Sequence, residues 1–237
     1  CQHCRAEAQH RAAPGQLTNA EGHELIDQLT SYERPYPMLV LTGGDCFERP
    51  DLVDLIEYAV GKGLHVSISP SVTPLFTRER VKAVQDAGVS VMSMSLDGGS
   101  AETHDAFRGF PGTFDRTIEA CHMLNELGMR FQLNTVFTAK NIHEAPQMLK
   151  NAIDLGAFMF YTFMLVPTGR GQHLDMLTPH EREDVLHWLH DNSTRIAIKT
   201  TEAPQYRRIA FQREAVRQGK AAPAKHGELY HWLTKET

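Results

Sequence analysis

Residues 88–99 read GVSVMSMSLDGG and join a helix stop, an apolar strand and a polar end in one short stretch. Gly88 closes an amphipathic segment that begins near Thr77, because glycine tolerates the dihedral angles that end a helix. The run 89–97 is rich in Val and Met and is typical of a buried strand. The same succession of helix, glycine and strand recurs on both sides of this stretch, so the chain is expected to alternate strands with helices.

The alternation predicts a parallel α/β fold. We predict strands at residues 37–42, 64–69, 89–97, 131–137 and 158–166, and helices at 19–31, 51–60, 77–88, 114–127, 142–155 and from Thr178 onward. Strands joined by helices of this length require right-handed crossovers and parallel pairing. Five strand–helix units are visible, and we expect a sixth from a segment upstream. A partial (β/α)6 TIM-type barrel with outer helices fits this pattern, and an open doubly wound sheet fits it less well.

Polar residues gather where the predicted strands end, at 42–45, 69–71, 95–97, Asn134 and 166–170. In a barrel the carboxyl ends of the strands meet at one mouth, which is where barrel enzymes carry their chemistry. Asn134 lies inside an apolar strand and must find hydrogen-bond partners there. The guanidinium of Arg170 at the mouth would suit a carboxylate or a phosphate.

Composition excludes several classes of partner. The 237 residues include 24 Lys and Arg against 29 Asp and Glu, a net charge of -5, which argues against nucleic acid or an anionic membrane as a partner. No apolar run approaches the roughly 20 residues of a membrane span, and the N-terminal residues are polar. We therefore expect a cytoplasmic protein. The first residue is Cys and not Met, so we expect the chain to be part of a longer reading frame.

Two of the four cysteines form a C-x-x-C pair, Cys1 and Cys4. This spacing suits a metal or cluster ligand pair or a redox disulfide. A zinc site would need further ligands, of which His10 is the nearby candidate, and an iron-sulfur cluster would need a third thiolate from upstream. Cys121 lies in a helical segment and is expected in the core, whereas Cys46 follows a glycine-rich turn.

In chain order the motifs are C-x-x-C, G-G-D after strand 37–42, S-L-D-G and H-D-A-F-R-G after strand 89–97, N-T-V, and V-P-T-G-R-G. Together they resemble the radical S-adenosylmethionine (radical SAM) enzymes, and the resemblance runs from Cys1 to about Tyr206. In that family a C-x-x-x-C-x-x-C loop holds a 4Fe-4S cluster by three thiolates, and SAM completes the fourth iron. The resemblance implies that Cys1 and Cys4 are the last two ligands and that the first lies four residues upstream. His3 stands where the family has an aromatic ring or His.

The resemblance also implies which residues contact SAM. Gly43, Gly44 and Asp45 match the G-G-E-P motif that receives the methionine amino group, with Cys46 in place of Pro. Ser95 and Asp97 match the S-x-D motif, and Arg108 matches the arginine that reaches the SAM carboxylate. The other matched positions are Asn134 near the ribose, Val166 near the adenine, and Ser69 with Ser71 at a turn that faces SAM or substrate. No catalytic acid or base is identified.

The stretches 95–115 and 165–171 are most similar to the SPASM/twitch branch, whose members mature peptides or proteins or modify tetrapyrroles, including heme-pathway decarboxylases. The implied reaction is reductive cleavage of SAM to a 5′-deoxyadenosyl radical, which takes hydrogen from a peptide, protein or tetrapyrrole substrate, with flavodoxin or ferredoxin as the reductant. We predict a barrel core at 1–200 and, at 201–237, an extension that leads toward a region with auxiliary iron-sulfur clusters. No Cys follows Cys121, so those clusters would lie beyond this sequence.

A second class of function needs no radical chemistry. Asp45, Asp97, His104 and Asp105 would surround a divalent metal in a TIM-barrel hydrolase or lyase. A zinc-binding module would instead use Cys1, Cys4 and His10. The hydrolase leaves the C-x-x-C pair without a role and requires His104 to turn inward.

Overall fold

The computed structural model describes residues 1–5, 8 and 12–237 of the chain. It divides into two compact units, which are treated separately. Unit 1 contains Cys1–Arg5, Ser95–Asp115 and Leu133–Thr237, and unit 2 contains Ala6–Met94 and Arg116–Gln132. His10, a ligand of the hypothetical zinc module, lies outside the described residues.

Six strands form one sheet in sequence order: β1 (Leu39–Leu41), β2 (Val66–Ile68), β3 (Val91–Ser95), β4 (Phe131–Phe137), β5 (Met159–Met164) and β6 (Ala197–Thr201). The pairs β1–β2, β2–β3, β4–β5 and β5–β6 are parallel. The predicted parallel α/β fold is therefore confirmed. Strand β6 lies in a segment where the sequence pattern predicted none, and the strand expected from an upstream segment stays a prediction.

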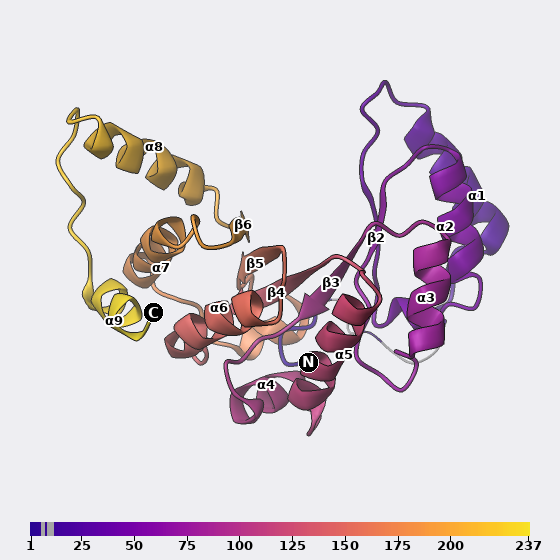
Figure 1. The fold of residues 1–237 in the computed structure, drawn as a ribbon, viewed down its shortest axis with the longest axis horizontal. Helices are drawn as coiled ribbons and strands as arrows, with labels where there is room; N and C mark the ends of the chain where they lie inside the picture. Colours follow the sequence, from indigo (N-terminus) through magenta and orange to yellow (C-terminus); the bar gives the residue numbers. More distant parts are fainter. Residues whose placement is uncertain (6–7, 9–11) are drawn as a thin grey trace. The chain divides into compact units, whose positions relative to one another are not determined.

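The helices are α1 (Asn19–Thr30), α2 (Leu52–Gly61), α3 (Arg78–Asp86), α4 (Ala101–Arg108), α5 (Thr113–Glu126), α6 (Ala145–Asp154), α7 (Pro179–Asp191), α8 (Gln205–Arg217) and α9 (Glu228–Glu236), as Figure 1 shows. Short 3-10 turns are η1 (Cys46–Glu48), η2 (Ile142–Glu144) and η3 (Gly169–His173). Helix α7 begins with a capping box, in which the Thr178 side chain accepts from the Glu181 N–H and the Glu181 carboxylate accepts from the Thr178 N–H. Helix α9 lies in the tail, where no helix was predicted.

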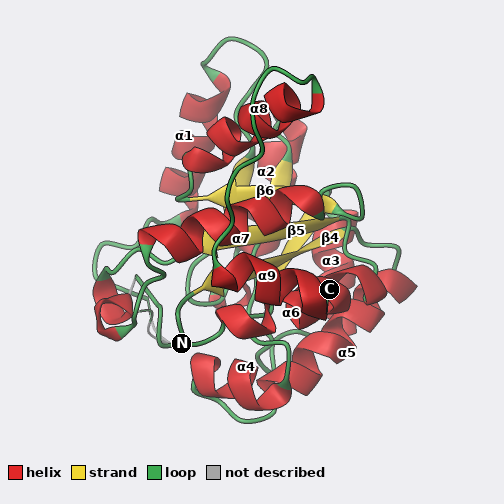
Figure 2. Cartoon of the chain, turned by 90° about the vertical axis from the view of Figure 1, so that its left-hand side faces the viewer, coloured by secondary structure: helices red, strands yellow, loops and turns green. Residues whose placement is uncertain are grey.

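In unit 1 the strands β4 and β5 alternate between fully and partly buried residues. We call the side of Leu133, Phe137 and Phe160 the buried face, and the side of Asn134, Tyr161 and Lys199 the open face. Helix α6 packs against β5, α9 packs against α6 and α7, and α8 packs against α7 (Figure 2). Because a parallel sheet is normally covered on both sides, an open face with polar residues points to a binding surface.

In unit 2 the helix α2 packs against both α1 and α3. Its core includes Ile56, Ile68 and Val81, which are completely buried. Gly88 has φ +105°, and a Cβ atom there would lie 2.9 Å from Cγ1 of Val60. The glycine that marked the helix stop is thus required both by its dihedral angle and by the close approach of a neighbouring helix.

No helix in the described part of the chain has the length and hydropathy needed to cross a bilayer.

Candidate active site

The first five residues, Cys1–Arg5, form a tight turn that we call the cysteine loop. The N–H of Cys4 lies 3.5 Å from the carbonyl oxygen of Cys1, which closes the turn. Both cysteines are half-buried. The C-x-x-C spacing therefore brings the two sulfur-bearing residues to the two ends of one turn, which suits a shared ligand.

One side of the cysteine loop is bound to the end of helix α4. The backbone N–H of Gln2 donates to the carbonyl of Phe107 at 3.0 Å, and its side-chain amide donates to the carbonyl of Ala106 at 2.9 Å. The ring of His3 stacks on that of Phe107 with centroids 4.8 Å apart. The last carbonyls of a helix have no partner within the helix, so Gln2 satisfies two of them while it anchors the loop.

The other side of the loop is bound to the turn η3. The N–H of Arg170 donates to the carbonyl of Cys4 at 3.1 Å. Gly169 has φ +55°, and a Cβ atom there would lie 2.7 Å from the carbonyl oxygen of Arg5 and 2.8 Å from that of Cys4. Within V-P-T-G-R-G the backbone of Gly169 and Arg170 thus holds the cysteine loop, while the side chain of Arg170 is exposed.

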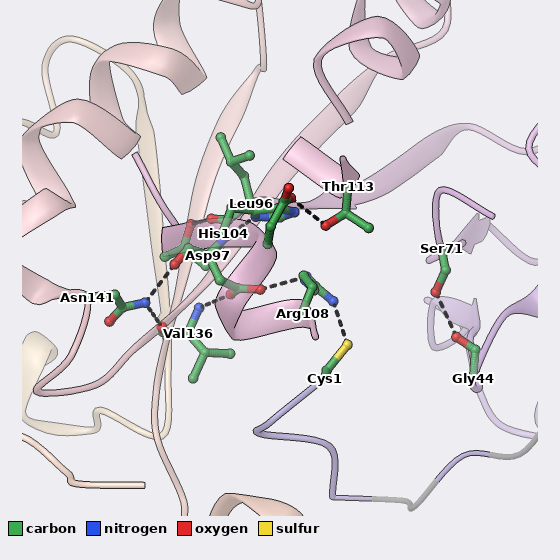
Figure 3. A network of polar contacts seen from close by, with 12 residues as sticks. Cys1, Gly44, Ser71, Leu96, Asp97, His104, Arg108, Thr113, Val136 and Asn141 are labelled. Carbon is green, nitrogen blue, oxygen red and sulfur yellow. Dashed lines mark hydrogen bonds and ion pairs between the residues drawn. The ribbon is translucent and has the colours of Figure 1, made fainter. Parts of the chain in front are cut away.

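Arg108 connects a buried carboxylate to the first cysteine (Figure 3). One guanidinium nitrogen lies 2.7 Å from Oδ2 of Asp97, and another donates to Sγ of Cys1 at 3.4 Å. Asp97 is only 1% exposed, and its Oδ1 accepts from the N–H of Val136 at 2.8 Å. Burial alone would raise the pKa of Asp97, but the Arg108 charge and hydrogen bonding lower it, so the carboxylate stays ionised.

The backbone of Asp97 is fixed by two buried side chains. Its N–H donates to Nδ1 of His104 at 3.1 Å, and its carbonyl accepts from the amide of Asn141 at 2.9 Å. Burial, followed by the nearby Arg108 charge, lowers the pKa of His104 to about 4. His104 is therefore neutral, with Nδ1 as an acceptor, and serves the structure of this site. Asn141, in the turn after β4, was not singled out in the sequence.

Two residues of the hypothetical hydrolytic metal site, His104 and Asp105, have structural roles within unit 1. Asp105 accepts hydrogen bonds from the N–H of Phe114 and the hydroxyl of Thr113, both at 2.8 Å, and so begins helix α5. His104 already accepts from the Asp97 backbone. Across residues 1–5, 8 and 12–237, no three His, Cys, Asp or Glu side chains are grouped to hold a metal ion.

In unit 2 the G-G-D motif forms its own polar cluster. Oδ1 of Asp45 accepts from the N–H groups of Phe47 at 3.1 Å and Ser71 at 3.3 Å, and Oδ2 accepts from the hydroxyl of Thr73 at 2.6 Å. The hydroxyl of Ser71 donates to the carbonyl of Gly44 at 2.9 Å (Figure 3). The acid of the motif thus ties the turn after β1 to the segment after β2.

Of the remaining predicted SAM contacts, Ser69, Ser95 and Val166 lie at or just past strand ends, and Asn134 lies in the middle of β4. Ser95 is the last residue of β3 and is half-buried. Asn134 is on the open face of β4, and Val166, 40% exposed, follows β5. Ser69 follows β2, and its N–H donates to the carbonyl of Leu41 at 2.9 Å. The predicted roles of these residues toward SAM stay predictions.

The four cysteines fall into two chemical classes. Burial raises the pKa of Cys46 to about 12, with the Asp45 charge as a further cause, and burial alone raises that of Cys121 to about 12. Both thiols are therefore poor sources of a thiolate ligand. At Cys1 the guanidinium of Arg108 suits a negatively charged sulfur. The donor set of the cysteine loop fits two ligands of an iron-sulfur cluster, whereas Cys46 and Cys121 do not fit a third.

Comparison with known proteins agrees with this geometry. Residues 1–152 match the family described as the Radical SAM superfamily. The AdoMet-dependent heme synthase of Oleidesulfovibrio alaskensis is 42% identical over 217 residues, which are 90% of this chain and 55% of that protein. The AdoMet-dependent heme synthase of Methanosarcina barkeri is 38% identical over 238 residues, which are 99% of this chain and 66% of that protein. The PqqA peptide cyclase of Bradyrhizobium diazoefficiens is 27% identical over 157 residues, 66% of this chain and 40% of that protein.

Among solved structures, that of Streptococcus suis SuiB bound to S-adenosylmethionine is similar with a TM-score of 0.69 and 14% identity, over 85% of this chain and 46% of that one. At this identity the likeness supports the fold alone, which agrees with the predicted partial TIM-type barrel. The chain spans 55% and 66% of the lengths of the two heme synthases.

Proposed function

The chain belongs to the radical SAM superfamily, and from this premise we propose that it forms the core of an enzyme that cleaves SAM reductively and acts on a tetrapyrrole. The observation that carries the proposal is the cysteine loop, which is held on both sides and has a cationic donor at Cys1. When bound, the reduced 4Fe-4S cluster supplies one electron to the sulfonium of SAM, which yields methionine and a 5′-deoxyadenosyl radical that takes a hydrogen atom from the substrate.

The residues of the chain hold and orient these groups. Cys1 and Cys4 would bind the cluster together with a third thiolate, which the family motif places four residues upstream of Cys1. Gln2 and Gly169 would keep the loop in place, so that the two sulfur atoms are positioned before the cluster binds. Arg108 would offer its remaining donor capacity to the SAM carboxylate while Asp97 fixes the guanidinium.

The proposed SAM contacts follow the motifs. They comprise the backbone of Gly43 and Gly44 with Asp45 for the amino group, and Ser69, Ser95, Arg108, Asn134 and Val166. Asp97, which is buried, would act through Arg108. Asp45 already accepts three hydrogen bonds from the protein, so we assign the nearby carbonyls the larger part in binding the amino group.

A tetrapyrrole is favoured over a peptide as the substrate because similarity is higher to the heme synthases, at 42% and 38% identity, than to the peptide cyclase, at 27%. The chain covers only part of these relatives, so the substrate belongs to the whole protein. The same proposal includes auxiliary iron-sulfur clusters, a domain boundary near residue 200, and flavodoxin or ferredoxin as the reductant.

The test uses full-length protein reconstituted with iron and sulfide under anaerobic conditions. With SAM and dithionite, 5′-deoxyadenosine is measured by chromatography with an iron porphyrin, with a peptide pool, or with neither. We expect the porphyrin to increase deoxyadenosine formation and to be modified, as seen by mass spectrometry. Stimulation and modification of peptides in place of porphyrins would contradict the assignment of substrate, and absence of deoxyadenosine in every arm would contradict the reaction.

A further inference from the structure

The open face of unit 1 presents two rows of side chains across three strands. In the parallel register Asn134 pairs with Tyr161, which pairs with Lys199. One step toward the carboxyl ends, Val136 pairs with Phe163, which pairs with Thr201. Residues paired in register lie on the same side of a sheet, so these six side chains share one surface.

An aromatic pair occupies the middle of this surface. The rings of Tyr161 and Phe163 have centroids 4.4 Å apart, and the Tyr161 hydroxyl is 2.5 Å from the hydroxyl of Thr201. Both aromatic residues are only half-buried. The hydrogen bond to Thr201 fixes the Tyr161 ring, so the pair forms a pre-positioned aromatic surface.

A cation borders the aromatic pair. Nζ of Lys199 lies 4.6 Å from the centroid of the Tyr161 ring, and Lys199 is exposed on β6. Within residues 1–5, 8 and 12–237, no carboxylate forms an ion pair with Lys199. The ammonium therefore keeps its capacity to pair with a carboxylate of a ligand.

Side-chain contacts connect this surface to the cysteine loop. Val136, in the second row, packs against a hydrophobic cluster made of Phe107, Leu165 and Leu174. Phe107 in turn stacks on His3 of the cysteine loop. A ligand on the aromatic pair would thus lie on the face of the sheet that carries Val136, whose contacts lead to the cysteine loop.

We propose that Tyr161, Phe163 and Lys199 bind the substrate as a planar aromatic ring system that carries carboxylates, with the edges of the two rings against its face and Lys199 paired to one carboxylate. This inference rests on the proposed function and deepens it by naming residues that select the tetrapyrrole. Asn134 and Thr201 are polar, so the aromatic pair and Val136 form the apolar part of the surface. SAM also combines a planar ring with a carboxylate, so the experiment has to separate these two ligands.

The experiment is anaerobic calorimetric titration of reconstituted full-length protein with hemin, with hemin dimethyl ester and with SAM. The ester retains the ring but masks the carboxylates. For Lys199→Met we expect hemin affinity to fall roughly five- to tenfold, to the affinity of the wild type for the ester, because one exposed ion pair is lost. Ester and SAM affinities should be unchanged, and Lys199→Arg should restore hemin binding to within about twofold.

Two further variants sharpen the result. Tyr161→Leu should weaken hemin and ester alike, by roughly two- to tenfold, because it removes a ring contact and leaves the charge in place. Lys150→Met is the matched control, since Lys150 lies on α6 and pairs with Asp154 away from the open face. It should bind all three ligands as the wild type does.

Equal hemin binding by wild type and Lys199→Met would overturn the inference, as would a loss of SAM affinity in place of hemin affinity. Equal loss of hemin and ester binding in Lys199→Met would also overturn it, because the lysine would then not act through the carboxylate. Wild-type protein that forms deoxyadenosine but binds neither porphyrin would contradict the tetrapyrrole proposal itself.

Discussion

Gly169→Ala should displace the cysteine loop, because the new Cβ atom would lie 2.7 and 2.8 Å from two carbonyl oxygens of that loop. Backbone oxygens of a tight turn cannot move away as a flexible side chain can. The substitution also places an L-residue at φ +55°, in the left-handed region. We expect strain of about 1–2 kcal/mol from the dihedral angle and a further ~1–3 kcal/mol from the overpacked contact.

Gly128→Ala separates these two effects. Gly128 has φ +66°, but a Cβ atom there would meet nothing within 4 Å, so only the dihedral strain of about 1–2 kcal/mol applies. The assay is the rate of iron release to a chelator from reconstituted full-length protein, with thermal unfolding followed in parallel. Since ~1–3 kcal/mol corresponds to roughly five- to 150-fold in an equilibrium, Gly169→Ala should lose iron faster than Gly128→Ala by a factor in this range.

Equal iron loss from the Gly169 and Gly128 variants would refute the reasoning. It would mean that η3 does not determine how the cysteine loop holds the cluster. A larger unfolding shift in Gly169→Ala without faster iron loss would contradict it too, since the strain would then be relieved elsewhere.

Three other predictions concern buried groups. Asp97→Asn should reduce the free energy of unfolding by roughly 3–5 kcal/mol, because it leaves Arg108 without its buried partner. In chemical denaturation, the double variant Asp97→Asn/Arg108→Gln should lose less stability than the two single variants added together. Additive losses would contradict the pairing. The pKa of His104 falls from 6.5 to about 4 on folding, so the unfolded chain takes up the proton first as the pH falls. The free energy of unfolding should therefore decrease by roughly 3 kcal/mol between pH 7 and pH 4. His104→Gln should flatten this pH profile, and an unchanged slope would count against a neutral buried His104. In cluster-free protein at pH 8, iodoacetamide should modify the two cysteines of the cysteine loop but not Cys46 or Cys121, whose pKa values are about 12. Mass spectrometry follows the modification. If Cys46 or Cys121 reacted as fast as the loop cysteines, their burial would be contradicted.

The sequence pattern predicts the strands and most helices because apolar periodicity and glycine stops coincide. Gly88 is such a case, since its position follows from both a dihedral angle and a contact with Val60. Strand β6 has the sequence AIKTT, which lacks an apolar run, and it forms because β5 offers it a parallel partner. Propensity within a short segment cannot reveal such a pairing.

Within the candidate site, the motifs indicate which residues come together but not how. His104 and Asp105 look like metal ligands in the sequence, whereas the structure uses one as an acceptor for Asp97 and the other to begin α5. Gln2 ties the cysteine loop to carbonyls of α4, and Gly169 leaves room for carbonyls of the loop; backbone carbonyls carry no side-chain signature. Only the fold brings these groups together.

The most direct test of the central claim compares Cys4→Ala with Cys121→Ala in reconstituted full-length protein. Iron and sulfide content, the EPR spectrum after reduction, and 5′-deoxyadenosine formed from SAM are measured on the same samples. The account predicts that Cys4→Ala loses the SAM-binding cluster and forms no deoxyadenosine, while Cys121→Ala, which removes a buried thiol with no ligand role, retains both. Full cluster content and deoxyadenosine formation in Cys4→Ala would contradict the assignment of the cysteine loop as the cluster site.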